Sequence, residues 1–171
     1  PSPADVLGYE LGERFTDHAS ILRYVDALVA AAPDRTRLER YGETVEGRPL
    51  VQLVIGRADY LSRLDGILAA NAELTRPETS AERARQIAAT NPAVVYFSYG
   101  VHGNESSSSE AALYTMWDLL RDAPEVAGVL DSLIVVIDPA MNPDGRERYV
   151  QWYRQARSAT PNPNPEAREH R

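Results

Sequence analysis

The sequence predicts an α/β fold with a mixed, largely parallel sheet flanked by helices. Two apolar runs rich in β-formers, Ala93 to Tyr99 and Ser132 to Ile137, lie on either side of a helix expected from about Ser107 to Arg121. A strand, a helix and a strand in this order form a βαβ unit with parallel strands. Because both runs are apolar along their length, we expect two buried strands.

The first element is predicted as an amphipathic helix from Thr16 to Ala32. Thr16 or Asp17 is its expected N-cap, Pro33 lies just past its end, and His18 is expected to be exposed on it. Its apolar positions recur at helical spacing: Ile21, Leu22, Val25, Leu28 and Val29.

A β-hairpin is expected next. Its strands are Leu38 to Tyr41 and Leu50 to Ile55, and the connection Glu46-Gly47-Arg48-Pro49 has the composition of a turn. Leucine and isoleucine at helical intervals then predict a helix over Tyr60 to Leu74, and a further helix is expected over Ser80 to Ala89.

The helix from Ser107 has an apolar inner face, formed by Ala112, Leu113, Met116, Trp117 and Leu120. Ser107 and Glu110 match a capping box at its start. The serine run from Ser106 to Ser109 is not predicted to supply a nucleophile, because the Gly-x-Ser-x-Gly elbow is missing and serines opening a helix usually cap it.

Length and composition narrow the class of protein. The 171 residues, 43% of them hydrophobic, fit one soluble globular domain. The absence of cysteine excludes disulfides and thiolate metal sites, so any metal site must use His and carboxylates. A net charge of −7 argues against a nucleic-acid partner, and no apolar run is long enough for a membrane span.

The charge is unevenly distributed along the chain. Residues 1–144 hold 12 Arg and 22 acidic residues, whereas residues 145–171 hold six Arg and three acidic residues, and the chain has no lysine. The basic end is either a solvated surface or an anion-binding wall, since the guanidinium fork suits carboxylates.

The loop after the first strand of the βαβ unit carries the clearest chemistry. In His102-Gly103-Asn104-Glu105 a histidine and a glutamate lie three residues apart at a strand-to-helix junction, with a glycine that lets the backbone bend. Imidazole nitrogen and carboxylate oxygen are zinc ligands, and catalytic zinc has three protein ligands. The spacing alone also fits a surface hydrogen bond or a helix cap.

The wider pattern resembles the M14 family of zinc metallocarboxypeptidases. The segment Val94 to Leu113 with its His-x-x-Glu pair is followed by Ile137 to Tyr149, which contains Asn142-Pro143-Asp144-Gly145. The hairpin Tyr41 to Leu50, with its Gly-Arg pair, also resembles the family. The similarity covers roughly Phe15 to Tyr149.

By this resemblance, His102 and Glu105 match the first two ligands of a single Zn²⁺ ion. The family's third ligand is a later histidine and its general base a still later glutamate, and neither can be placed here. The histidine that follows the motif, His170, lies beyond a proline-rich stretch, so we do not expect it to replace the third ligand.

The resemblance also implies an arginine that stabilises the oxyanion. Arg154 is the first candidate and Arg157 the second, while the family's Asn-Arg pair for the substrate carboxylate has no counterpart. The Asn142 to Gly145 segment reads as a turn with a structural role.

We therefore expect the chain to hold only part of a catalytic domain. Residues 1–171 would form the N-terminal portion of a single zinc-peptidase catalytic domain, with residues 158–171 as a Pro/Arg-rich loop that continues into the remainder of the domain after Arg171. The complete protein would hydrolyse C-terminal peptide bonds of a peptide substrate, and this fragment would be inactive.

Two alternatives stay open. The protein could be an M14-like zinc amidohydrolase, or deacylase, of small acyl-amino acids, or a non-catalytic peptide-binding homologue. The resemblance also suggests a secreted or periplasmic protein.

Overall fold

The computed structural model describes residues 1–121, 123–126 and 128–156, and within these ranges the strands form one sheet in the order β1-β2-β4-β3. The strands are β1 (Thr36–Glu43), β2 (Pro49–Ile55), β3 (Ala93–Ser98) and β4 (Leu133–Asp138). β1 pairs antiparallel with β2, β2 antiparallel with β4, and β3 parallel with β4. The α/β class and the parallel βαβ unit are confirmed, although antiparallel pairing contributes more to the described sheet than expected because the hairpin joins it through β2.

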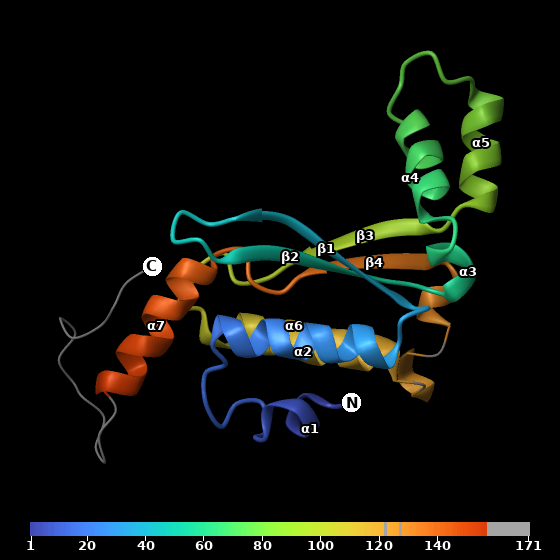
Figure 1. The fold of residues 1–171 in the computed structure, drawn as a ribbon. Helices are drawn as coiled ribbons and strands as arrows, with labels where there is room; N and C mark the ends of the chain where they lie inside the picture. The colour runs from blue at the N-terminus through green and yellow to red at the C-terminus, as the bar shows by residue number, and fades with distance from the viewer. Residues whose placement is uncertain (122, 127, 157–171) are drawn as a thin grey trace.

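Helices cover one face of the sheet along its length and only one end of the other face. Figure 1 shows α2 and α6 beneath the sheet with α1 below them, α4 and α5 rising from the opposite side at one end, and α7 at the other end. The helices are α1 (Pro3–Leu7), α2 (His18–Ala31), α3 (Ala58–Leu61), α4 (Leu64–Glu73), α5 (Ala81–Thr90), α6 (Ser106–Leu120) and α7 (Pro143–Ala156), with 3₁₀ turns at Pro124–Val126 and Val129–Asp131.

The main core lies between the sheet and the pair α2 and α6. It is built from apolar side chains of alternate strand positions and of the inner helix faces, among them Ile21, Leu28, Leu53, Ile55, Leu113, Met116, Val135 and Ile137. A smaller cluster on the opposite face packs α4 on the sheet through Val54, Leu64, Ile67 and Ile134. No helix among the described residues is long and apolar enough to cross a membrane.

Several expected elements are confirmed. α2 begins after Asp17, whose side chain accepts a hydrogen bond from the Ser20 N–H at 2.8 Å. The hairpin forms as predicted with longer strands. The helix expected over Tyr60 to Leu74 is divided into α3 and α4 at Ser62 and Arg63, and α5 follows an N-cap at Ser80.

Two helices were not expected from the sequence. α1 follows a capping box of Ser2 and Asp5 with Pro3 at its first position. α7 begins at Pro143, so the Asn142 to Gly145 segment opens a helix instead of forming an isolated turn. The Asn142 side chain accepts a hydrogen bond from the Gly145 N–H at 2.9 Å, which is N-cap chemistry.

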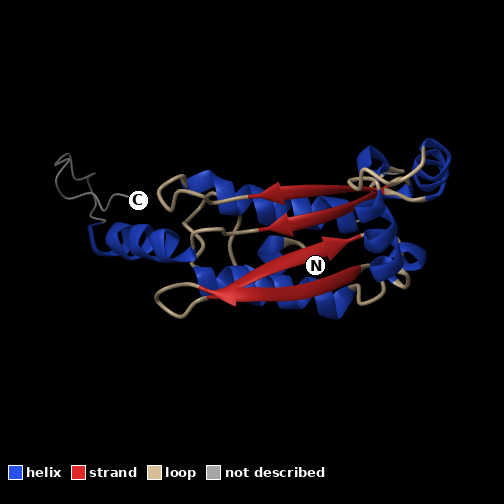
Figure 2. Cartoon of the chain, turned by 90° about the horizontal axis from the view of Figure 1, so that it is seen from above, coloured by secondary structure: helices blue, strands red, loops and turns tan. Residues whose placement is uncertain are grey.

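The prediction that the strand from Ala93 is buried is wrong. Among the described residues β3 is an edge strand, and Val94, Tyr96 and Phe97 are 37%, 50% and 42% exposed. Figure 2 shows β3 as the outermost strand on its side of the sheet. An apolar run reveals that a strand can be buried, but not whether a neighbouring strand covers it.

The predicted capping box of α6 is also wrong. The N-cap is Glu105, without a side-chain capping bond, and Glu110 instead turns inward and is 8% exposed. Ser107 is exposed.

His18 is buried, contrary to the expectation that it is exposed. It is 5% exposed, its Nε2 lies 3.0 Å from the Pro49 carbonyl oxygen, and its Nδ1 is buried without a hydrogen-bond partner. Burial lowers the pKa of His18 below its ordinary value of 6.5, and nearby Arg48 acts in the same direction against Glu147 and Asp144. The hairpin packs over this position, which the helical pattern alone does not reveal.

We predict that acid destabilises the protein through His18. Because its pKa is lower in the folded than in the unfolded chain, the folding stability that depends on neutral His18 is complete above pH 6.5 and is lost as the pH falls towards the folded pKa. One proton limits the slope to about 1.4 kcal/mol per pH unit. Thermal unfolding of His18→Gln, which does not titrate, should depend less on pH between 7.5 and 5.5 than that of the wild type. Equal pH dependence of the wild type and His18→Gln would contradict the assignment.

Candidate metal site at the ends of β3 and β4

The loops after β3 and β4 run side by side. Because the two strands are parallel, their carboxyl ends lie at the same edge of the sheet. The Met141 N–H donates to the Tyr99 carbonyl at 2.9 Å, and the Asn142 N–H donates to the Gly100 carbonyl at 3.0 Å. These backbone hydrogen bonds extend the pairing of the strands into the loops.

A close backbone contact joins the first loop to the start of α7. A Cβ atom built on Gly103 would lie 1.9 Å from the carbonyl carbon of Gly145 and 2.3 Å from the nitrogen of Arg146. Only glycine fits there, because the neighbouring atoms belong to the backbone and cannot turn aside. Gly103 therefore lets the His102 to Glu105 loop lie against the start of α7.

The end of β4 is fixed by a buried carboxylate. Asp138 is 1% exposed and accepts hydrogen bonds from the Tyr41 hydroxyl, the Tyr96 hydroxyl at 3.4 Å and the Ala140 N–H at 3.1 Å. Burial raises the pKa of Asp138, against the hydrogen bonds that favour its ionised form. Groups from β1, from β3 and from the second loop thus all bond to Asp138, the last residue of β4.

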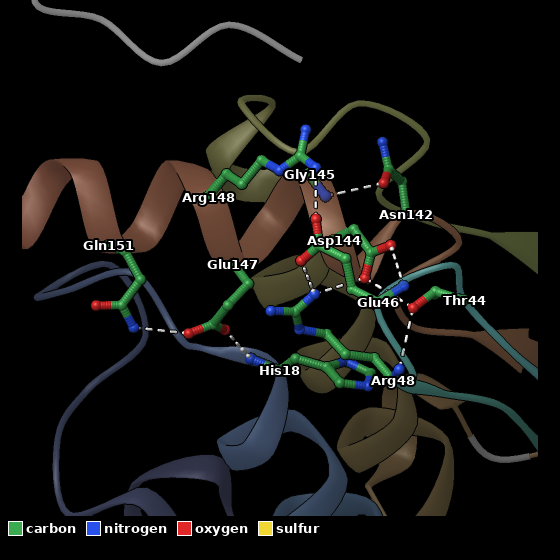
Figure 3. Close-up of polar contacts among 10 residues, drawn as sticks. All are labelled: His18, Thr44, Glu46, Arg48, Asn142, Asp144, Gly145, Glu147, Arg148 and Gln151. Atoms are coloured by element: carbon green, nitrogen blue, oxygen red, sulfur yellow. Dashed lines mark hydrogen bonds and ion pairs between the residues drawn. The ribbon is translucent and has the colours of Figure 1, made fainter.

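The hairpin loop is tied to the start of α7 by an ionic cluster, shown in Figure 3. The Asp144 carboxylate accepts hydrogen bonds from the Thr44 hydroxyl at 2.7 Å and from Arg48 at 2.6 Å. Although burial opposes it, these hydrogen bonds lower the pKa of Asp144. Glu46 pairs with both Arg48 and Arg148, so the Gly-Arg hairpin seen in the sequence anchors α7.

A buried ion pair joins α7 to α6. Arg146 is 2% exposed and donates from Nη2 to both carboxylate oxygens of Glu110 at 2.7 Å. Its other donors reach the carbonyls of Thr16 at 3.1 Å and Ser106 at 2.8 Å, and Glu110 also accepts from the Thr16 N–H at 2.8 Å. Sequence reasoning missed this pair, yet it left a signal: Glu110 precedes Leu113 by three residues and Trp117 by seven, which places a charge on the apolar face of the helix.

The structure places both predicted ligands in the braced loop. His102 is half-buried, Glu105 is exposed as the N-cap of α6, and the Glu105 N–H donates to the His102 carbonyl at 3.2 Å. Among the described residues neither side chain has a hydrogen-bond or ion-pair partner, so neither is committed to another contact. One imidazole and one carboxylate are donors that zinc accepts.

The donor set is incomplete. No group of three His, Asp or Glu side chains suited to a metal occurs within the described ranges. His18 is committed to Pro49, and His170 lies outside the described residues. The described residues thus offer two of the three protein ligands that a catalytic zinc takes.

The structure does not bring Arg154 to this loop. Arg154 donates to the Asp17 carboxylate at 2.7 Å at the start of α2, with its side chain 47% exposed. Along α7 it lies nine residues, or about 13 Å, beyond Gly145, the residue that contacts the loop. Arg157, the second candidate, and the Pro/Arg-rich segment 158–171 lie outside the described residues.

A cleft adjoins the start of α6 directly after Glu105. It has a volume of about 460 Å³ and lies between the segment Leu11 to Phe15, α6 and α7. Its walls combine the hydroxyls of Ser106 and Ser107 with the rings of Phe15, Tyr114 and Tyr153.

Comparison with known proteins identifies the family in which a βαβ unit carries a His and a Glu in its crossover loop. A family model described as zinc carboxypeptidase, peptidase family M14, matches residues 21–167. The chain belongs to this family, and the resemblance inferred from the sequence is confirmed. A search of curated proteins finds no match.

Solved structures of two carboxypeptidases and of thrombin-activatable fibrinolysis inhibitor share the fold. Carboxypeptidase A from Helicoverpa armigera is 19% identical over 84% of this chain and 30% of that chain, with a TM-score of 0.57. Thrombin-activatable fibrinolysis inhibitor is 13% identical over 96% and 36%, with a TM-score of 0.61. A metallo-carboxypeptidase from Burkholderia cenocepacia is 20% identical over 77% and 28%, with a TM-score of 0.52. The chain thus spans about a third of the length of these structures.

The contact between Gly103 and the first turn of α7 predicts that Gly103→Ala is destabilising. The added methyl group must displace the backbone of Gly145, and overpacking of this kind costs about 1–3 kcal/mol. Chemical denaturation would show the loss as a lower midpoint. Gly66→Ala is the control, since Gly66 is helical with nothing within 4 Å of its Cβ position and should be neutral or slightly stabilised. Equal stability of the two variants would disprove the contact.

Proposed function

We propose that this chain supplies the N-terminal portion of the catalytic domain of a zinc-dependent metallocarboxypeptidase that hydrolyses C-terminal peptide bonds. The observation that carries the proposal is the His102 and Glu105 pair, which is free of other described partners in a loop braced against α7. Membership of the M14 family and the fold shared with solved carboxypeptidases support it.

His102 and Glu105 would hold one Zn²⁺ ion through an imidazole nitrogen and a carboxylate oxygen. In this class of site the metal polarises the scissile carbonyl and lowers the pKa of a bound water. The third ligand and the glutamate that takes the proton would come from the remainder of the domain after Arg171. This chain covers only about a third of the length of the solved structures that it matches, which supports a site completed by residues outside it.

The chain's own contribution is to position the ligands. The backbone pairing of the two loops, the Gly103 contact and the Arg146 and Glu110 ion pair hold the loop in one conformation. A preorganised loop binds metal without first losing conformational entropy. Arg154, and in second place Arg157, stay the candidates for oxyanion stabilisation, and Arg154 would have to release Asp17 to act.

The cleft beside Ser106 and Ser107 is the proposed entry for a peptide substrate. Its aromatic walls and the two hydroxyls suit a peptide side chain and backbone. A secreted or periplasmic location is proposed with this activity, on the family's precedent alone.

We predict weak zinc binding by the 171-residue chain. With two ligands, calorimetric titration with ZnCl₂ should give a low affinity, and His102→Ala or Glu105→Gln should abolish the heat. His18→Gln, in which another histidine is replaced, should leave it unchanged. Tight equimolar binding that His102→Ala abolishes would contradict the two-ligand site and identify His170 as a third ligand.

Activity is tested on the full-length protein. Release of a C-terminal amino acid from an N-blocked dipeptide, lost with a chelator and with His102→Ala, is the expected result. Zinc binding without peptide hydrolysis, together with cleavage of small acyl-amino acids, would instead establish the amidohydrolase. The absence of both zinc binding and hydrolysis would favour a non-catalytic homologue.

A further inference from the structure

The backbone just before His102 is held by α6 and by the loop after β4. The Gly100 N–H donates to the Ser108 hydroxyl of α6 at 2.8 Å, and the Gly100 carbonyl accepts from the Asn142 N–H at 3.0 Å. Gly100 has a φ of +67°, and a Cβ atom built on it would lie 3.4 Å from Cα of Ala140. The position of His102, two residues further on, therefore depends on where the second loop lies.

The second loop takes its course from Asp138, the last residue of β4. One carboxylate oxygen of Asp138 accepts from the Ala140 N–H at 3.1 Å, so the side chain bonds the backbone two residues further along and forms a local turn. After this turn the Met141 N–H donates to the Tyr99 carbonyl at 2.9 Å, and the two loops run together. The orientation of one buried carboxylate thus guides the second loop towards the first.

The other carboxylate oxygen of Asp138 accepts from tyrosines of two different strands. The Tyr41 hydroxyl of β1 forms the shorter hydrogen bond, at 2.5 Å, and the Tyr96 hydroxyl of β3 the longer one, at 3.4 Å. β2 lies between β1 and β4 in the sheet, so the Tyr41 side chain reaches across a strand to Asp138. Asp138 is 1% exposed, and a buried acceptor that loses its donor is costly.

An irregularity in β1 lies at the residue that makes this contact. The pairing of β1 with β2 shifts register between Arg40 and Gly42, and Tyr41 is the residue between them without a partner on β2. An extra residue of this kind bends its strand and redirects a side chain, and such bulges are common beside functional sites. The bulge therefore has a specific consequence at β4, where it brings a hydroxyl to Asp138.

We propose that Asp138, held by Tyr41, is a positioning residue that acts through the second loop on the loop carrying His102. As a statement about the metal site, the inference rests on the proposed function and extends it to side chains that share no hydrogen bond with His102 or Glu105 in the described chain. Burial raises the pKa of Asp138, and the Tyr41 hydroxyl opposes this by favouring the ionised form. Groups behind the ligands of a metal commonly tune its affinity.

A matched hydrogen bond at the other end of β4 separates positioning from general stability. The Tyr60 hydroxyl donates to the Asp131 carbonyl at 2.6 Å, two residues before β4 begins. Tyr60→Phe therefore removes a similar hydroxyl at the end of the sheet away from His102. If Tyr41 contributed only to stability, Tyr41→Phe and Tyr60→Phe would have the same effect on the two loops.

Hydrogen exchange of the metal-free 171-residue chain tests the positioning directly. In Tyr41→Phe the amides of Met141 and Asn142, which donate to the first loop, should exchange faster than in the wild type. In Tyr60→Phe their exchange should not change. Equal protection of these amides in the wild type and Tyr41→Phe would overturn the proposal.

Calorimetric titration with ZnCl₂ adds a readout at the ligands. Tyr41→Phe and Asp138→Asn should each weaken zinc binding about 10-fold, whereas Tyr60→Phe should keep the wild-type affinity. The double variant should bind no more weakly than Asp138→Asn, because Tyr41 acts through Asp138. Unchanged affinity in Tyr41→Phe, or losses that add in the double variant, would overturn the proposal. A wild type without zinc affinity would contradict the proposed function instead, and faster exchange in Tyr41→Phe would still establish the positioning of the loop.

Discussion

The ion pair between Arg146 and Glu110 is the interaction on which the candidate site depends. Both charges are removed from water, which costs several kcal/mol per ion. The cost is offset only because Nη2 of Arg146 donates to both carboxylate oxygens of Glu110 while Nε and Nη1 donate to the carbonyls of Thr16 and Ser106. The pair joins the fourth residue of α7 to the fifth of α6. It thereby fixes the starts of two helices, each of which directly follows one of the two loops of the candidate site.

The remaining contacts are consistent with this anchor. Gly103 can lie against Gly145 because α7 starts where Arg146 holds it, and the hairpin adds a second restraint through Asp144. His102 and Glu105 are left outside these restraints, one half-buried and one exposed. Side chains that brace the loop are thus distinct from those proposed to bind metal, which explains how a rigid loop can retain ligands without other partners.

Much of the fold could be predicted from the sequence because local patterns determine its helices, hairpin and βαβ unit. The periodicity of α2, the turn residues of the hairpin and the βαβ unit are local. The spacing of His102 and Glu105 is local too, while their role as zinc ligands came from the family resemblance and stays a prediction. The exposure of β3, the burial of His18 and the inward turn of Glu110 depend on what packs against each residue, and a local pattern does not contain that information. The helix α7 was missed because Asn142-Pro143-Asp144-Gly145 suits both a turn and a helix start. Arg154 was proposed near the candidate site from its distance along the chain. That distance does not show that Arg154 lies on α7 with its side chain paired to Asp17.

The most direct test of the anchor is a double-mutant cycle on the free energy of unfolding, using Arg146→Met, Glu110→Gln and the double variant. Each single change leaves one charge buried without its partner and should cost about 3–5 kcal/mol. The double variant should lose much less than the sum, with a coupling energy of at least about 2 kcal/mol. Losses that add to within about 0.5 kcal/mol would show that the two residues do not act together and would contradict the account.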